Sequence, residues 1–290
     1  MLPRSFKYAR PESLAEASAL LAAHPGSRPL AGGQSLLNVV KLRAAEVEAL
    51  IDISRLDELR FVEVDADGDL EIGAGMRYRE LAEHPLVGEH QPLVADVADH
   101  LVDVQVRTRG TLGGNVCYAD PTSNFPPLLV ALAATIRLAG PGGTRDVPAE
   151  DFTVGPFRCD LRPGEVVRSV VIPRQAHDAG VGYQSLQLGR DSWALARATA
   201  WVQGNGTVTA ARVVLGCIGP RPARQRAIEA ALIGTTGDAA SVSAAVAVEL
   251  EDVDAVGDSH ASAEYRTEMA RVQAARAIRQ ALATRNRGDR

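Results

Sequence analysis

The chain has few cysteines and few aromatic residues, and each shortage excludes a class of function. Among its 290 residues the only cysteines are Cys117, Cys159 and Cys217. They are far apart and form no C-x-x-C pair, so the sequence predicts neither a disulfide framework nor a zinc or iron–sulfur site. Aromatic residues make up 4% of the chain and the formal net charge is -5. Stacking platforms and a basic surface are therefore missing, which argues against a nucleic-acid partner.

Long apolar runs are also absent. No stretch approaches the ~20 apolar residues that a membrane span needs. The first six residues, MLPRSF, lack the apolar core of a secretory signal. The six histidines are scattered without the spacing of metal ligands. We therefore expect a cytoplasmic protein without a membrane span and without a metal site of its own.

Two short glycine segments are the most informative feature that is present. Residues 31–36 read AGGQSL, and residues 111–116 read TLGGNV. Adjacent glycines let the backbone approach a ligand closely and adopt positive φ. Successive N–H groups in such a loop form a concave anion site, and nearby hydroxyls add donors. Two such loops could hold one extended ligand with a central pyrophosphate, such as FAD. The alternative is that each glycine pair is an ordinary turn.

The hydrophobic pattern indicates at least two domains, which suits a chain of this length. Helices are expected at 13–24, 36–42 and 125–134, a mainly helical region at 78–102, and hairpins around 61–73 and 136–147. A further strand is expected at 165–172, and the polar segment 173–182 then marks a domain boundary. After it, three strands are expected at 181–188, 198–202 and 208–215, followed by helices near 223–233, 238–250 and 262–283.

Two polar groupings allow a functional and a structural interpretation. Asp96, Asp99 and Asp103 could bind a metal, but their helical spacing favours a solvated helix face. Cys117 lies two residues after Asn115, so a covalent cysteinyl flavin is conceivable; a buried thiol is the interpretation that we favour. No histidine falls in either glycine segment.

Four segments in order resemble a known family. They are 31–36 with the basic 41–43, then 105–121, 165–173 and 262–266. In order and spacing they resemble the FAD-binding medium subunit of molybdenum hydroxylases, the group of aerobic carbon monoxide dehydrogenase and xanthine dehydrogenase. The resemblance implies an α+β fold. A two-lobed FAD-binding domain of the vanillyl-alcohol-oxidase or PCMH type would occupy 1–55 and 56–176. A C-terminal domain of three antiparallel strands and three helices would occupy 177–290.

The resemblance also implies non-covalent FAD and a set of contact residues, with the first loop along the pyrophosphate and the second beside phosphates and ribitol. The set comprises Pro29, Leu30, Ala31, Gly32, Gly33, Gln34, Ser35, Leu36, Leu101, Thr111, Gly113, Gly114, Asn115, Tyr118, Asn124, Val167 and Gln187. Two of these depart from the family. Asn124 stands where Asp is frequent, so we expect a weaker contact. Gln187 stands where Lys is frequent, so a positive charge beside the flavin is lost.

The function that the resemblance implies is an oxidoreductase subunit for electron transfer. Iron–sulfur clusters of the 2Fe-2S type on a small partner would reduce the FAD, and a large molybdopterin subunit would oxidise the substrate. The whole would be a dimer of heterotrimers, with NAD⁺, a quinone or oxygen as acceptor. No acid–base catalytic residue is expected in this chain, because the cofactor carries the chemistry. The alternatives are a stand-alone FAD oxidase and an assembly subunit that has lost FAD.

Overall fold

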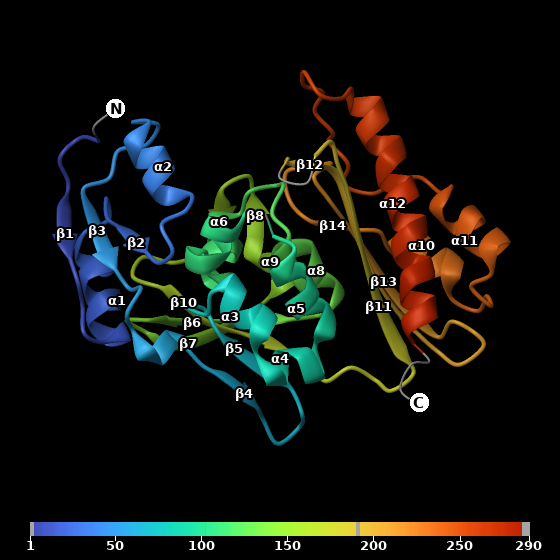
Figure 1. Ribbon diagram of the computed structural model, residues 1–290, viewed down its shortest axis with the longest axis horizontal. Coiled ribbons are helices and arrows are strands. Elements are labelled where there is room, and N and C mark those ends of the chain that lie inside the picture. The colour runs from blue at the N-terminus through green and yellow to red at the C-terminus, as the bar shows by residue number, and fades with distance from the viewer. Residues whose placement is uncertain (1–2, 102, 190–191, 286–290) are drawn as a thin grey trace. The chain divides into compact units, whose positions relative to one another are not determined.

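The computed structural model describes residues 3–101, 103–189 and 192–285, which form two compact units. Figure 1 shows the order of the elements along the chain. The first unit comprises the chain up to Tyr118 together with Thr135–Phe152 and Arg158–Ile172. The second comprises Ala119–Ala134, Thr153–Phe157 and the chain from Pro173 onward. The last of these segments begins at Pro173; the domain boundary that the sequence predicts within 173–182 stays a prediction.

A small parallel sheet opens the first unit. Its strands β1 (Lys7–Ala9), β3 (Ala49–Asp52) and β2 (Arg28–Leu30) lie in that order. Helix α1 (Leu14–Ala23) begins at Ser13, whose hydroxyl oxygen accepts a hydrogen bond from the backbone N–H of Glu16 at 3.1 Å. Its buried side chains include Leu14, Ala17 and Leu21, which pack in a core with residues of β3. Helix α2 (Leu36–Lys41) follows β2.

A five-stranded antiparallel sheet forms the rest of this unit's core. Its order is β4 (Val62–Val64), β5 (Leu70–Gly73), β10 (Val166–Ile172), β6 (Thr135–Gly140) and β7 (Gly143–Pro148). The pairs β4–β5 and β6–β7 confirm both expected hairpins. Strand β10 lies in the middle, and five of its seven residues are buried. The sequence therefore predicts the hairpins, and the central strand comes from a distant part of the chain.

The region 78–102 is mainly helical, as expected, and consists of three short helices. They are α3 (Tyr78–Glu83), α4 (Pro85–His90) and α5 (Pro92–Asp99), and α6 (Val104–Arg109) and α7 (Leu112–Tyr118) follow. Pro85 and Pro92 begin α4 and α5, since a first-turn proline has no N–H to lose but stops a preceding helix. The unit is completed by η1 (Asp57–Leu59), α9 (Ala149–Phe152) and β9 (Arg158–Cys159).

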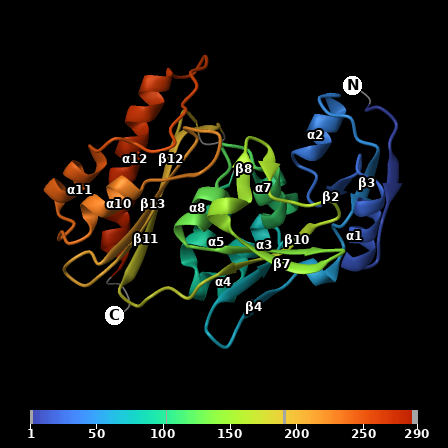
Figure 2. The same cartoon turned by 180° about the vertical axis from the view of Figure 1, so that it is seen from behind.

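The second unit is an antiparallel sheet with helices packed on it. Strands β11 (Ala179–Gln187), β12 (Ala194–Gln203), β13 (Ala210–Gly216) and the short β14 (Ala223–Arg224) lie in chain order. Helices α10 (Arg226–Leu232), α11 (Ala239–Val246) and α12 (Ala263–Thr284) follow them (Figure 1 and Figure 2). The α+β class and the three long strands with three helices are confirmed. The two-residue β14 is an addition that the sequence analysis did not predict.

Small residues bring α12 close to this sheet. Alanines of β12, among them Ala196, Ala198 and Ala200, share a buried core with Ala274 and Ala277 of α12. Because side chains alternate along a strand, the residues between them face the opposite side of the sheet. Helix α8 (Phe125–Ala131) packs against β12 and β13, and every one of its residues is buried.

Two segments expected in the second FAD-binding lobe belong to the second unit instead. They are Ala119–Ala134, which contains α8, and Thr153–Phe157, which contains β8 (Thr153–Gly155). The physical reason is burial: α8 is apolar all round, and β12 and β13 supply part of the surface that covers it. The division into lobes at residue 55 stays a prediction. Among the described helices, none is both long and apolar enough to cross a membrane.

Candidate functional site

The first glycine segment forms a tight loop between β2 and α2. Gly33 has a φ of +74°, a conformation that side chains with a Cβ rarely adopt. Gly32 packs against the backbone that precedes the second segment: a Cβ there would lie 2.2 Å from the carbonyl oxygen of Arg109. The two glycine segments, far apart in sequence, therefore meet within the first unit.

The backbone of this loop presents unused hydrogen-bond donors. Within the described residues, the N–H groups of Gly32, Gly33, Gln34, Ser35 and Leu36 donate to no protein acceptor, and Leu37 is the first to bond back, to Gly33. Ser35 occupies the N-cap position of α2, yet its side chain makes no capping hydrogen bond. A run of free N–H groups with a free hydroxyl matches the needs of a phosphate group.

The second glycine segment differs from the expected loop. It forms the start of α7, and neither Gly113 nor Gly114 has a positive φ. Its N–H groups are already used, since Gly113 donates to the Ala74 carbonyl at 2.9 Å and Gly114 to the Thr111 hydroxyl at 3.1 Å. Gly113 is required by packing, because a Cβ would lie 2.6 Å from that of Ala74. The idea of two equivalent phosphate-cradling loops is therefore wrong for this segment.

What α7 offers instead is an unpaired side-chain acceptor. The Oδ1 atom of Asn115 is buried and has no hydrogen-bond partner among the described residues. The Asn115 side chain is hydrogen-bonded to Tyr78, whose pKa burial raises to about 12. A buried acceptor without a donor costs about 1–3 kcal/mol, which a ligand hydroxyl or N–H would recover. This orphaned oxygen and the free donors of the first loop fit a cofactor that has both phosphates and a hydroxylated chain, as FAD has.

The remaining predicted residues divide between the two units. Leu101 and Val167 are buried in the first unit, at 3% and 2% exposure, as apolar lining would require. Tyr118 ends α7 and is partly buried. Asn124 and Gln187 belong to the second unit, where Gln187 donates from Nε2 to the Ser192 carbonyl at 2.8 Å. The roles of all these residues at the cofactor stay predictions.

The two groupings that the sequence left open have structural explanations. Asp96 and Asp99 lie on α5, but Asp103 caps α6 by accepting from the N–H of Val106 at 2.8 Å. Among the described residues no three His, Cys, Asp or Glu side chains are placed to hold a metal. The pKa of Cys117 is raised by its hydrogen bond with Cys159 and by burial, so its thiol stays protonated. A protonated thiol is a poor nucleophile, which favours the inert interpretation.

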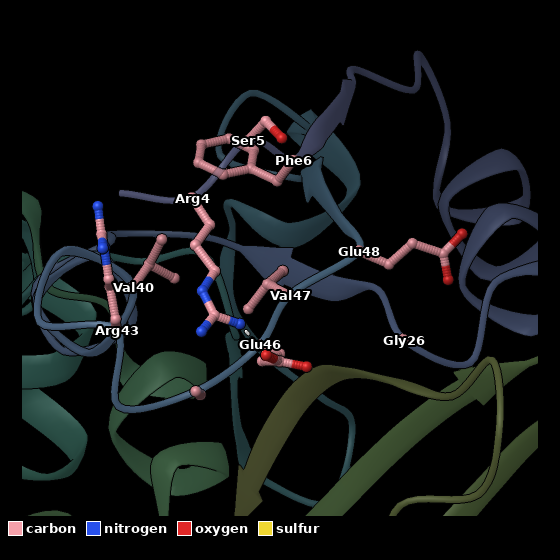
Figure 3. A pocket seen from close by; sticks show the side chains of 10 residues that line it. Arg4, Ser5, Phe6, Gly26, Val40, Arg43, Glu46, Val47 and Glu48 are labelled. Atoms are coloured by element: carbon pink, nitrogen blue, oxygen red, sulfur yellow. Dashed lines mark hydrogen bonds and ion pairs between the residues drawn. The ribbon is translucent and has the colours of Figure 1, made fainter. Parts of the chain in front are cut away.

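An open hollow on the first unit, with a volume of about 420 Å³, contains none of the predicted cofactor residues (Figure 3). Arg4 points across it toward Glu46, with which it forms an ion pair. Its lining comprises Arg4, Ser5, Phe6, Gly26, Val40, Arg43, Ala45, Glu46, Val47 and Glu48. The hollow is thus separate from the two glycine segments.

Sequence reasoning overlooked one residue beside a predicted contact. Arg197 lies on β12, is 2% exposed, and donates to the backbone just before Asn124. The signal was present: a single arginine interrupts the apolar run ALARATAWV. A charged residue there must find partners when the strand is buried.

Comparison with known proteins identifies the class that this fold and site define. Residues 4–175 match the FAD-binding domain of molybdopterin dehydrogenases, and residues 182–281 match the C-terminal domain of the carbon monoxide dehydrogenase flavoprotein. The chain belongs to the FAD-binding medium subunits of molybdenum hydroxylases. It is therefore an FAD-binding subunit of an oxidoreductase.

Individual relatives cover nearly the whole chain. The carbon monoxide dehydrogenase medium chain of Hydrogenophaga pseudoflava is 34% identical, covering 98% of this chain and 99% of its own. The glyceraldehyde dehydrogenase medium chain of Sulfolobus acidocaldarius is 33% identical, covering 97% and 99%. The structure of carbon monoxide dehydrogenase from Oligotropha carboxidovorans superposes with a TM-score of 0.94 at 32% identity, covering 98% of this chain and 100% of that one.

Proposed function

We propose that this chain carries electrons through bound FAD, from iron–sulfur clusters on a partner subunit to an external acceptor. The observation that supports this most directly is the pairing, within one unit, of a loop of free N–H groups with the orphaned oxygen of Asn115. When bound, FAD supplies the electron-transfer chemistry. The residues of this chain would bind and orient it: Gly32 to Leu36 at its phosphates, and Asn115 at a hydroxyl or N–H.

The proposed partners are a small subunit with 2Fe-2S clusters and a large molybdopterin subunit, assembled as a dimer of heterotrimers. The relatives are named as medium chains of carbon monoxide and glyceraldehyde dehydrogenases, which supports a multi-subunit complex. An iron–sulfur cluster needs about four cysteine ligands. The chain has three cysteines, Cys117, Cys159 and Cys217, which are fewer than such a cluster needs, so we place the clusters on the partner subunit. A cytoplasmic location is also a prediction, made from the sequence.

The overall similarity of this chain to its relatives does not single out one substrate. Medium chains of a carbon monoxide dehydrogenase and of a glyceraldehyde dehydrogenase match it almost equally well, at 34% and 33% identity. Under the proposed function the substrate is oxidised on another subunit, so no acid–base residue is required here. The proposed external acceptor is NAD⁺, a quinone or oxygen.

The test is to compare the isolated FAD-loaded chain with the complex purified with its native partners. We expect no substrate oxidation by the isolated chain. Its flavin absorbance should bleach once the iron–sulfur and molybdenum subunits are added with substrate. Substrate turnover by the isolated chain would instead establish a stand-alone oxidase. A chain that takes up no FAD would establish the assembly subunit.

A further inference from the structure

Cys117 and Cys159 meet within the first unit, although 42 positions separate them in the sequence. Cys117 lies near the end of α7, and Cys159 ends β9, against which α7 packs. The Cys159 thiol donates a hydrogen bond to the backbone carbonyl oxygen of Cys117, with 3.6 Å between sulfur and oxygen. The two thiols are also hydrogen-bonded to each other. Both residues are partly exposed, whereas Cys217 is buried.

The hydrogen bond between the two thiols makes the two sulfur atoms chemically different. Cys117 donates it, and this bond together with burial raises the pKa of Cys117. Cys159 accepts it, which lowers the pKa of Cys159. A thiolate is the form of cysteine that reacts with peroxides, and a neighbouring thiol then captures the oxidised sulfur. Cys159 therefore has the properties of the attacking sulfur, and Cys117 those of the resolving one.

Cys159 stands on backbone that is firmly anchored. The next residue, Asp160, accepts two hydrogen bonds from Arg145 of β7, one at its carboxylate at 2.7 Å and one at its carbonyl oxygen at 2.9 Å. Arg145 is itself held by the carboxylate of Glu165, at 2.7 and 3.0 Å. A change in the distance between the two sulfur atoms is therefore passed on to α7 rather than to β9.

Helix α7 carries the other cysteine of the pair close to the candidate cofactor site. Asn115, whose buried Oδ1 atom has no partner among the described residues, lies two positions before Cys117. The start of the helix is held, since the N–H of Gly113 donates to the carbonyl oxygen of Ala74 at 2.9 Å. A displacement of Cys117 must therefore turn the helix about its start and move Asn115.

We propose that Cys117 and Cys159 form a reversible oxidation site, at which hydrogen peroxide links them in a disulfide, and that this disulfide weakens the binding of FAD. The coupling to FAD rests on the proposed function, whereas the disulfide itself does not. In reducing compartments disulfides are rare, and those that form are usually transient and catalytic or redox-sensing. The pair makes the loading of the flavin site responsive to peroxide.

The reaction balances with hydrogen peroxide as the oxidant. The Cys159 thiolate attacks one peroxide oxygen, so that a sulfur–oxygen bond forms, the oxygen–oxygen bond breaks, and hydroxide leaves as water with the proton that the thiol has lost. The sulfur of Cys117 then attacks that of Cys159, the sulfur–oxygen bond breaks, and hydroxide leaves as water with the Cys117 proton. Two thiols and one peroxide give one disulfide and two waters, and a dithiol reverses the oxidation by thiol–disulfide exchange.

The disulfide must shorten the distance between the two sulfur atoms. It holds them at about 2 Å, which is shorter than a hydrogen bond between thiols. Because Arg145 anchors the segment that follows Cys159, the end of α7 moves, and Asn115 moves with it. Loss of one ligand hydrogen bond corresponds to roughly three- to tenfold in affinity. We expect the oxidised chain to bind FAD more weakly by this factor.

The first test counts the thiols of the full-length apo-chain, after peroxide treatment and denaturation, with a chromogenic thiol reagent. Wild type should fall from three reactive thiols to one, and a dithiol should restore all three. Cys217→Ser keeps the pair and should fall from two thiols to none, whereas Cys159→Ser should keep both of its thiols. Peptide mapping should find Cys117 linked to Cys159 within one chain. Three thiols that persist, or a loss that a dithiol does not reverse, would overturn the proposal.

The second test measures FAD affinity of the reduced and the oxidised apo-chain by fluorescence quenching. Peroxide should weaken binding by wild type roughly three- to tenfold, and a dithiol should restore it. Cys159→Ser, which lies outside both glycine segments, should bind FAD equally well before and after peroxide. Cys217→Ser is the matched control and should respond as wild type does. Thermal unfolding of each reduced apo-variant verifies that it is folded.

The two parts of the proposal fail differently. A disulfide that leaves FAD affinity unchanged would overturn the coupling, and so would an equal response of Cys159→Ser and wild type. If the reduced wild-type chain binds no FAD, the proposed function is overturned and the coupling with it. The thiol count of the apo-chain still decides whether the disulfide forms.

Discussion

At the scale of single residues, Gly33 is the position at which the cofactor loop depends most on glycine. Its φ of +74° disfavours any Cβ, and one built there would lie 2.9 Å from the Leu37 side chain. We expect Gly33→Val to purify largely without FAD, because a β-branched residue resists this conformation and blocks close approach. The measurement is the flavin-to-protein absorbance ratio.

Two further glycine variants sharpen this prediction. Gly114→Val should also lose FAD, since a Cβ there would lie 2.8 Å from the Thr111 hydroxyl that accepts from the Gly114 N–H. Gly142→Ala is the control, as no atom lies within 4 Å of its added Cβ. Full FAD occupancy in folded Gly33→Val and Gly114→Val would refute the assignment of both segments.

Arg197 is the residue whose removal should cost the second unit most stability. Arg197→Met would remove the buried guanidinium that donates to the carbonyl oxygens of Thr122 and Ser123, and would leave both oxygens without this donor. Each unsatisfied group costs about 1–3 kcal/mol, so the free energy of unfolding should fall by about 2–5 kcal/mol. Urea denaturation measures it. The exposed Arg276→Met should change stability by less than about 0.5 kcal/mol; equal effects of the two variants would contradict the prediction.

At the scale of elements, the contact between β11 and α12 depends on missing side chains. A Cβ on Gly182 would lie 2.1 Å from the Ala277 carbonyl oxygen, and one on Gly180 would lie 2.0 Å from that of Ala281. We expect Gly182→Ala to lower the free energy of unfolding by about 1–3 kcal/mol, because the helix must move away from the sheet. Gly88→Ala, in α4 with open space around it, should raise it by about 0.5–1 kcal/mol. Denaturant titrations of the two variants test this prediction, because their free energies of unfolding should change in opposite directions.

The start of α12 has a pH dependence of its own. The backbone N–H groups of His260 and Ala261, together with the guanidinium of Arg266, lower the pKa of Asp258 to about 2 from the ordinary 3.8. A lowered pKa means that the ionised carboxylate stabilises the fold above pH 3.8, and that this contribution disappears as the pH falls toward 2. Asp258→Asn should therefore be less stable than wild type at neutral pH. The gap should close between those two values, as thermal unfolding at a series of pH values would show; a gap independent of pH would contradict the assignment.

At the scale of the whole molecule, we expect one non-covalent FAD per chain. Neither glycine segment contains a histidine, and the hydrogen bond with Cys159 together with burial raises the pKa of the Cys117 thiol, which keeps it protonated. Acid precipitation of the purified protein should therefore release the flavin into the supernatant, where its absorbance is measured. A yellow pellet with a colourless supernatant would show a covalent bond.

Much of the local structure follows from the sequence because its causes are local. The hydroxyl of Ser13 starts α1, and the Asp67-Gly68-Asp69 turn joins β4 to β5. The strands expected at 181–188, 198–202 and 208–215 overlap β11, β12 and β13. The positive φ of Gly33 also has a local cause, because glycine has no Cβ. The order of the four motifs likewise sufficed to assign the family, which the comparisons confirm.

What only the tertiary structure decided depends on residues that are distant in sequence. The first N–H groups of α7 donate to the carbonyl oxygens of Met76 and Ala74, and no pattern within 111–116 contains those partners. The same holds for the unpaired oxygen of Asn115, and for the hydrogen bond that the Tyr183 hydroxyl donates to the amide oxygen of Asn124. Sequence patterns report which side chains are apolar and where the backbone is free to turn. Which donor meets which acceptor is fixed only when packing brings distant strands and helices together, because a hydrogen bond acts over about 3 Å.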